Sequence, residues 1–74
     1  RWFVPFSDPT NGEETYGAGR LIDPEIPRAG EPVILDFNLA YNLPCAFNSL
    51  VACPLPSRHN RLTAPVRAGE KSPE

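Results

Sequence analysis

Ten prolines spread along 74 residues constrain the fold of this chain more than any other feature. Proline fixes φ and donates no backbone hydrogen bond, so it breaks helices and is confined to edge strands, bulges and turns. Together with five glycines, the prolines leave almost no window free of helix breakers. Long helices are therefore not expected, and the longest proline-free window, residues 10–23, is predicted to be a turn followed by a strand.

Four segments are predicted to form strands: residues 2–6, 15–22, 33–38 and, with a weaker pattern, 61–67. Pro5 predicts an edge position or a bulge in the first segment, and the Asn11-Gly12 pair predicts the turn that follows it. The link over residues 23–32 carries no helix signal, so the second and third strands are expected to pair antiparallel. Residues 39–42 could form a single helical turn that ends before Pro44.

Chain length bears on the fold class, because 74 residues lie at the lower edge of what folds alone. We predict a mainly β fold, a small antiparallel sheet or partial barrel with long ordered proline-rich loops, as a fragment of a larger β domain. Residues 1–67 are expected to form a single β-rich unit and residues 68–74 a polar tail. A missing N-terminal region or a homo-oligomer partner is expected to complete the core. Four aromatic residues should then be exposed or meet foreign apolar surface: Trp2, Phe3, Phe6 and Phe37.

The charge pattern excludes some partners. The net charge is −2, with acidic and basic residues interspersed, which argues against nucleic acid as a partner. No apolar stretch is long enough to cross a membrane and no signal peptide is visible, so the default expectation is a cytoplasmic protein. No cofactor or metal is expected.

Polar residues at strand spacing define the candidate site. The two-residue period places Asp36 and Asn38 on the face opposite Val33, Leu35 and Phe37, which are predicted to face the core. The same period aligns a second polar set along residues 14–20, with glycines on the opposite face that allow close approach. The ligand-binding candidates are Glu14, Tyr16, Arg20, Asp36, Asn38, Tyr41 and Asn42.

Three interpretations of these residues remain open. In the first, they line a pocket for a small anionic or polar molecule, with Arg20 binding a carboxylate or phosphate. In the second, the chain is an enzyme of the hydrolase or isomerase type, with Asp36 or Glu14 as general base and Arg20 as electrostatic stabiliser. In the third, the polar residues only cap turns and form ion pairs in a structural fragment.

Cys45 and Cys53 flank an irregular apolar segment, and His59 follows them. Their spacing matches no common zinc pattern and lacks a fourth ligand, and nothing indicates a nucleophilic Cys-His pair. A disulfide and two buried free thiols remain, of which free thiols behaving as small hydrophobes are favoured. Either way, the cysteines are expected to be structural, because each lies beside a proline that fixes the local backbone.

Three stretches in order carry a resemblance to a known family: Phe6-x-Asp8-x-Thr10-x-Gly12-x-Glu14-Thr15-Tyr16-Gly17-x-Gly19-Arg20-x-x-Asp23, Leu35-Asp36-Phe37-Asn38-x-Ala40-Tyr41-Asn42-x-Pro44-Cys45-Ala46, and Cys53-Pro54-Leu55-Pro56 with Asn60-Arg61-Leu62. They resemble the C-terminal part of the prokaryotic domain-of-unknown-function family numbered sixteen eighty-four. The resemblance implies an absent upstream portion, itself β-rich, and it implies no activity. The chain departs from the family pattern at Ala18, Leu43 and Arg58-His59, and the last departure argues against a family-wide catalytic role for His59.

Overall fold

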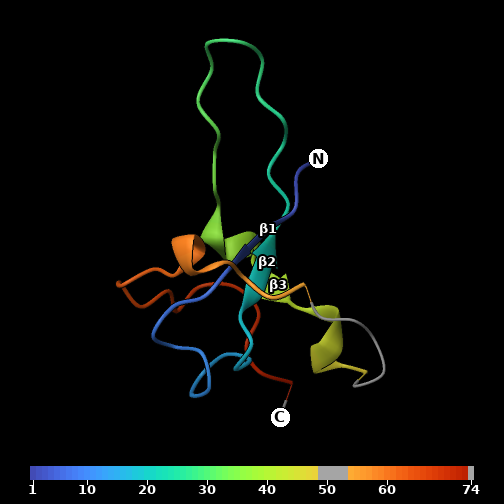
Figure 1. Ribbon diagram of the computed structural model, residues 1–74, viewed down its shortest axis with the longest axis vertical. Coiled ribbons are helices and arrows are strands. Elements are labelled where there is room, and N and C mark those ends of the chain that lie inside the picture. The colour runs from blue at the N-terminus through green and yellow to red at the C-terminus, as the bar shows by residue number, and fades with distance from the viewer. Residues whose placement is uncertain (49–53, 74) are drawn as a thin grey trace.

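The computed structural model describes residues 1–48 and 54–73 and has a small antiparallel sheet at its centre (Figure 1). The strands are β1 (Val4–Phe6), β2 (Arg20–Ile22) and β3 (Tyr41–Asn42), in the order β1-β2-β3. Within the described residues, three short 3-10 helices accompany them: η1 (Phe37–Leu39), η2 (Pro44–Ala46) and η3 (Arg58–Asn60). The mainly β class is confirmed, and the sheet is open rather than a barrel.

Strand β2 is central because its residues are the ones that can be buried on both sides. Leu21 and Ile22 are buried apolar residues, and β2 pairs antiparallel with both neighbours. Pro5 lies opposite Leu21 in β1, at the edge of the sheet, as its missing N–H group requires. The prediction of an edge position for Pro5 is therefore confirmed.

Both edges of the sheet are covered by irregular chain. On the β1 side, Ser7 pairs with Arg61 in a parallel bridge, and the Asn60 side chain donates to the carbonyl of Pro5 at 2.9 Å. On the β3 side, the backbone N–H of Glu70 donates to the carbonyl of Ala40 at 2.9 Å. Covered edges leave fewer unpaired backbone groups open to other chains.

Three predicted strand extents are wrong. Of residues 15–22 only the last three form a strand, because Gly19 has φ +109° and turns the chain sharply. Residues 33–36 are in no assigned secondary structure and lead into η1, with the helical turn two residues before its expected position. Residues 61–67 contribute only the Arg61 bridge. On the side away from β1, the strand that pairs with β2 is β3, whose residues were expected to form a helical turn.

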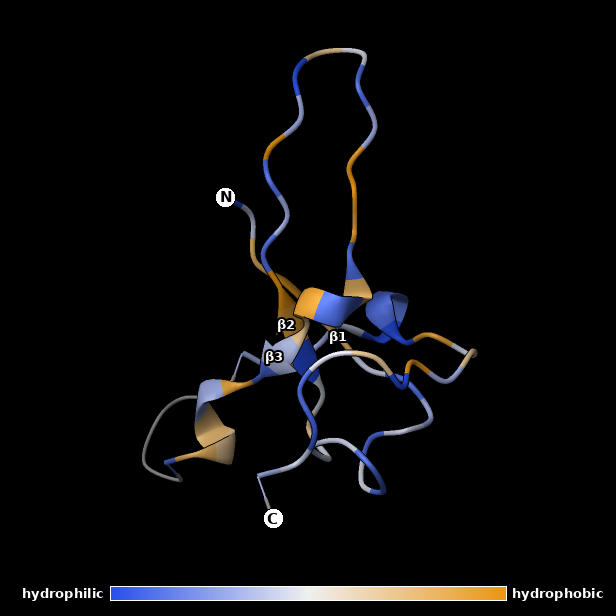
Figure 2. Ribbon diagram, turned by 180° about the vertical axis from the view of Figure 1, so that it is seen from behind, coloured by the Kyte–Doolittle hydropathy of each residue, from blue (hydrophilic) through white to orange (hydrophobic). Residues whose placement is uncertain are grey.

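Residues 23–36 form the feature that we call the arm, which rises from β2 and returns to η1 (Figure 1). The predicted pairing of its second leg with β2 is wrong. Among the described residues, its backbone hydrogen bonds outside β2 run from Glu31 N–H to the carbonyl of Arg28, from Trp2 N–H to the carbonyl of Pro24 and from Leu39 N–H to the carbonyl of Asp36. Three prolines in the arm lack donors, so the two legs cannot complete a regular ladder. Apolar residues occur along both legs (Figure 2).

The apolar core is small. Phe6, Ile22 and Ala40 form its buried cluster, and the ring of Phe37 packs edge-on against Phe6 with centroids 5.4 Å apart. Of the four aromatic residues expected to be exposed, Trp2 and Phe3 are 44% and 73% exposed, whereas Phe6 is buried by the chain itself and Phe37 is partly buried. The expectation is thus met at Trp2 and Phe3 and wrong for Phe6.

Among the described residues, no helix has the length and apolar character needed to traverse a membrane.

Candidate functional site

Arg20 is the centre of a buried polar cluster. Its side chain is fully buried, and its guanidinium donates to the backbone carbonyls of Val66 (2.8 Å), Ala68 (2.5 Å) and Glu70 (3.3 Å). An ion pair to the buried carboxylate of Asp8 spans 3.8 Å. All of these partners belong to the chain itself, so Arg20 holds the protein together in the described structure.

Burial and the charge of Asp8 shift the pKa of Arg20 in opposite directions. Desolvation lowers the pKa of Arg20 below its usual value, while coulombic attraction to Asp8 raises it and only partly compensates. The guanidinium also lies 5.3 Å from the centroid of the Phe6 ring, a cation–π arrangement that suits a desolvated cation. Because guanidinium groups stay protonated in proteins, Arg20 remains a cation at neutral pH.

We call residues 66–71 the C-terminal strap. Asn42, a second candidate residue, binds this strap as Arg20 does. Asn42 is buried, its backbone N–H donates to the Glu70 carboxylate at 2.8 Å, and its side-chain amide donates to the carbonyl of Lys71 at 3.0 Å. The polar composition of residues 68–74 does not predict these contacts. Arg20 and Asn42 are cross-strand neighbours, and within the described residues each retains one buried polar atom without a partner, Nε of Arg20 and Oδ1 of Asn42.

Asp8 is an important buried polar residue that was not among the site candidates from the sequence. Its carboxylate accepts from the backbone N–H of Val66 (2.6 Å), and from the N–H (3.2 Å) and hydroxyl (2.9 Å) of Thr10. The available signal was the Asp8-Pro9-Thr10 turn, in which an Asp side chain commonly bonds to the backbone two residues later.

Glu14 and Tyr16 lie apart from a shared pocket. Glu14 forms a partly exposed ion pair with Arg67, at 3.6 Å between Oε2 and Nε. The Tyr16 hydroxyl donates to the sulfur of Cys45 at 3.5 Å. The strand that would have aligned both residues with Arg20 does not form, since β2 begins only at Arg20.

Cys45 is in a disulfide, so the favoured interpretation of a free thiol is wrong for this residue. The other cysteine of the chain, Cys53, lies outside the described residues. A crosslink stabilises a small chain chiefly by restricting its unfolded state. Within residues 1–48 and 54–73, no three or more His, Cys, Asp or Glu residues lie together so that they could hold a metal ion.

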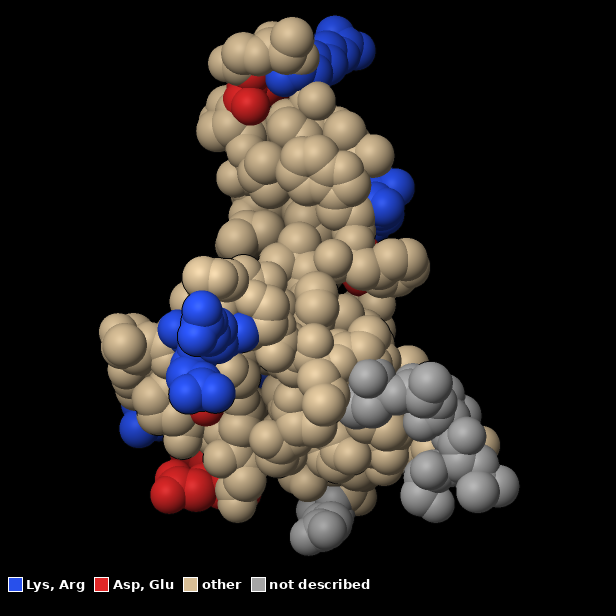
Figure 3. Space-filling model, in the orientation of Figure 1, with Lys and Arg blue, Asp and Glu red and all other residues tan. Residues whose placement is uncertain are grey.

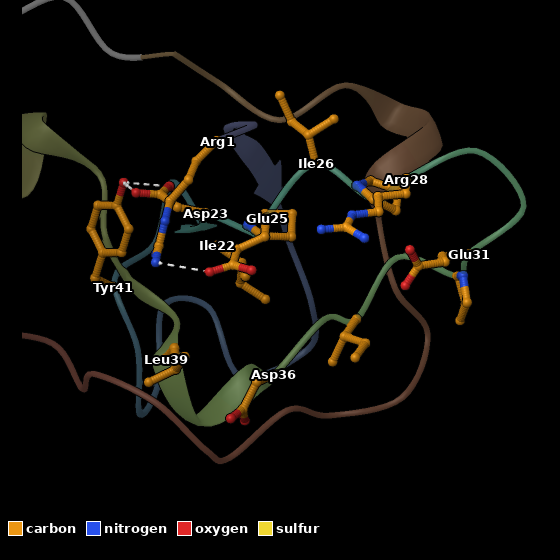
Figure 4. A pocket seen from close by; sticks show the side chains of 14 residues that line it. Arg1, Ile22, Asp23, Glu25, Ile26, Arg28, Glu31, Asp36, Leu39 and Tyr41 are labelled. Atoms are coloured by element: carbon orange, nitrogen blue, oxygen red, sulfur yellow. Dashed lines mark hydrogen bonds and ion pairs between the residues drawn. The ribbon is translucent and has the colours of Figure 1, made fainter.

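The other candidate residues lie at the base of the arm. A cavity of about 730 Å³, which we call the arm pocket, opens between the two legs and the β3 end of the sheet (Figure 4). Tyr41 and Asp36 line it, whereas Glu14, Tyr16, Arg20, Asn38 and Asn42 do not. The structure thus separates the seven candidates into buried, surface and pocket residues.

Two polar groups of the arm pocket have defined partners. The Tyr41 hydroxyl donates to both carboxylate oxygens of Asp23, at 2.7 and 2.9 Å. Desolvation, followed by the hydrogen bond to Asp23 and its negative charge, raises the pKa of Tyr41 to about 12. Asp36 caps η1, with Oδ1 accepting from both the backbone N–H (3.0 Å) and the side-chain amide (3.1 Å) of Asn38. The capping interpretation therefore holds for the Asp36 and Asn38 pair.

The side-chain alternation predicted for residues 33–38 holds only over residues 32–36 of the second leg, where no strand forms. The prediction that Val33 and Leu35 face the core is wrong, since they are 40% and 42% exposed. Pro32, Ile34 and Asp36 line the arm pocket, whereas Val33 and Leu35 do not. An extended backbone points successive side chains to opposite sides whether or not it is paired. The sequence analysis missed the pocket residues of the first leg, from Asp23 to Arg28, because proline-rich links have no side-chain period to interpret.

A small open antiparallel sheet with a projecting arm and a ligand-sized cavity at its base defines a mainly β module. The chain belongs to the family described as "Protein of unknown function (DUF1684)", which matches residues 1–71. The resemblance inferred from the sequence motifs is therefore confirmed. No curated protein matches the chain.

Proposed function

We propose that this protein is a binding module that holds a small polar organic molecule in the arm pocket. The observation that carries the proposal is the cavity itself, whose volume of about 730 Å³ falls within the range of about 300–1,000 Å³ typical of ligand sites. Seven of its fourteen lining residues are apolar, and the polar groups among the others can orient a ligand, as polar groups do in such sites.

The polar groups support the proposal because their positions are fixed by other contacts. The bond between Tyr41 and Asp23 joins β3 to the start of the arm, and Asp36 is held by its cap on η1. Groups held in place before a ligand arrives lose little conformational entropy on binding. Tyr41 and Asp36 are also the two candidates from the sequence analysis that reach the cavity.

The enzyme alternative has no specific observation in its favour. It required Arg20 as stabiliser beside Asp36 or Glu14, but the guanidinium of Arg20 is fully buried and occupied by the strap and by Asp8. Glu14 makes its ion pair with Arg67 instead. We therefore propose binding without a chemical step.

A thermal-shift screen of the chain against a panel of metabolites tests the proposal, because a ligand that binds only the native state raises the melting temperature. The blocking variant is Ile34→Trp, which places a large ring into the cavity at a side chain that is 77% exposed. Val33→Trp is the matched control, since its neighbour Val33 does not line the cavity. We expect a shift that Ile34→Trp abolishes and Val33→Trp keeps; equal shifts in both variants would place the ligand elsewhere.

A further inference from the structure

Seven of the fourteen residues that line the arm pocket are apolar. Ile22 lies at its base, and Ile26, Ile34 and Leu39 flank it with 58%, 77% and 67% of their surface exposed. Pro24, Pro27 and Pro32 add rigid apolar surface to the lining. A ligand with an apolar body would remove this surface from water, at about 25 cal/mol for each Å² buried.

The charges around the same cavity are unbalanced. Four carboxylates of the described residues line it, and against them stand two guanidinium groups, those of Arg1 and Arg28. Arg1 is already paired, with 3.5 Å between its Nη2 and Oε1 of Glu25. An anionic ligand would therefore meet three remaining carboxylates, with Arg28 as the guanidinium left to oppose them among the described lining residues. The carboxylates belong to Asp23, Glu25, Glu31 and Asp36.

Asp36 offers a free acceptor at the inner end of the pocket. Both hydrogen bonds that it accepts from Asn38 end on Oδ1, and within the described residues Oδ2 accepts none. Asp36 lies two residues after Ile34 on the same side of the leg, so a charged group at Oδ2 and an apolar body along Ile34 could be bound together. Arg28 is the one Lys or Arg residue of the arm, and it lies at the turn of the arm tip, away from this inner end. Figure 3 shows basic side chains at that tip.

We propose that the arm pocket selects an amphipathic organic cation, an ammonium group on an apolar body, with the carboxylate of Asp36 as its principal counter-charge. This inference rests on the proposed function and narrows the small polar ligand to a positively charged class. It also replaces the expectation of an anionic ligand, which depended on Arg20.

Paired probes of equal size test the charge preference. The chain is titrated with n-hexylammonium and separately with hexanoate, and binding is followed by backbone amide chemical shifts of Ile34, Leu39 and Tyr41. We expect saturable binding of the cation with an affinity about tenfold above that of the anion. Added salt should reduce this difference because it screens the charges.

Asp36→Asn is the decisive variant, because asparagine keeps the Oδ1 acceptor that caps η1 and removes only the charge. We expect it to weaken hexylammonium binding by about three- to fivefold, the size of one partly exposed ion pair. Glu13→Gln is the matched control, an exposed carboxylate that does not line the cavity, and should leave binding unchanged.

The outcomes separate this inference from the proposed function. Equal or tighter binding of hexanoate, no saturable binding of hexylammonium, or no effect of Asp36→Asn would each overturn the cation preference. The proposed function would still stand if a metabolite gave a thermal shift that Ile34→Trp abolishes and Val33→Trp keeps. A panel without any such shift would instead overturn the pocket as a ligand site, and the cation preference with it.

Discussion

At the scale of single residues, identical side-chain types have different roles because their surroundings differ. Arg20 is fully buried and binds three backbone carbonyls, whereas Arg67 is largely exposed and meets one carboxylate at the surface. Tyr41 is held by Asp23, while Tyr16 donates to a sulfur. Local sequence cannot distinguish these cases, since burial depends on residues far along the chain.

Removing the Arg20 guanidinium should destabilise the fold strongly. Arg20→Met would leave the carboxylate of Asp8 and three strap carbonyls buried without their donor, at a cost of about 3–5 kcal/mol in the free energy of unfolding. Arg67→Met, in the exposed pair, should change it by less than about 0.5 kcal/mol. Urea unfolding of both variants measures the difference, and similar losses would refute a central role for Arg20.

The raised pKa of Tyr41 predicts that the folded protein loses stability at alkaline pH. Its folded pKa is about 12, above the ordinary value of 10.0, so the folded state favours the neutral phenol. This contribution is fully present below pH 10.0 and is lost as the pH rises towards about 12.

Ultraviolet absorbance of the phenolate should therefore show one tyrosine that ionises only near pH 12. Asp23→Asn should lower that pKa, because it removes the negative charge that opposes ionisation of Tyr41. Tyr41→Phe should remove the late transition altogether. Its persistence in Tyr41→Phe would assign the raised pKa to Tyr16 instead.

At the scale of elements, the arm and the strap differ in how many hydrogen bonds hold their backbones in place. The arm has few backbone hydrogen bonds and exposed side chains over residues 28–36. The strap has a similarly irregular backbone, but Arg20, Asp8 and Asn42 bind its main-chain groups. Order in a segment without secondary structure thus depends on which buried side chains reach it.

Two glycines have nearly the same positive φ but differ in the space around them, and the comparison shows how closely the strap is packed at position 69. Gly69 has φ +85° and Gly30, at the tip of the arm, φ +84°. A Cβ at position 69 would lie 2.8 Å from the Phe37 carbonyl oxygen and 2.9 Å from that of Ala40, whereas at position 30 it meets nothing within 4 Å.

Gly30→Ala should therefore cost only the backbone strain of a positive φ, about 1 kcal/mol, while Gly69→Ala should cost about 1–3 kcal/mol more because the strap must move. Denaturant unfolding of the two variants gives both values. Equal costs would show that the strap tolerates displacement.

Hydrogen exchange should distinguish the arm from the sheet. Amides of residues 33–35 donate no described backbone hydrogen bond and are expected to exchange close to unprotected rates. The backbone of β2 is paired on both sides and should be the most protected segment. Strong protection of the arm in the free protein would contradict the arrangement of its legs and show that another surface covers it.

At the scale of the whole molecule, a small core coexists with considerable exposed apolar surface. The chain measures 40 × 27 × 21 Å, and the arm accounts for its elongation (Figure 1). Trp2 and Phe3 are exposed just before β1, whereas Phe6 at the end of β1 is buried. Aromatic residues close together in sequence can thus differ widely in what they contribute to stability.

Phe3→Ala and Phe6→Ala make this difference measurable. We expect Phe6→Ala to cost about 3–5 kcal/mol, because it leaves a hole beneath Arg20 and Phe37. Phe3→Ala should change the unfolding free energy by less than about 0.5 kcal/mol in the isolated chain. A large loss at Phe3 would mean that another surface already covers it, such as a second copy of the chain.

The sequence by itself determined the absence of long helices from the described residues, the edge position of Pro5, the family, and the side-chain alternation over residues 32–36, because each depends on backbone chemistry or on a local motif. Tertiary structure decided which polar residues meet. It paired Arg20 with Asp8 and the strap, moved the partner of β2 from residues 33–38 to Tyr41–Asn42, and left Asp36 and Tyr41 to line a cavity. The physical reason is that strand pairing and charge burial depend on contacts between distant segments, which no local period encodes.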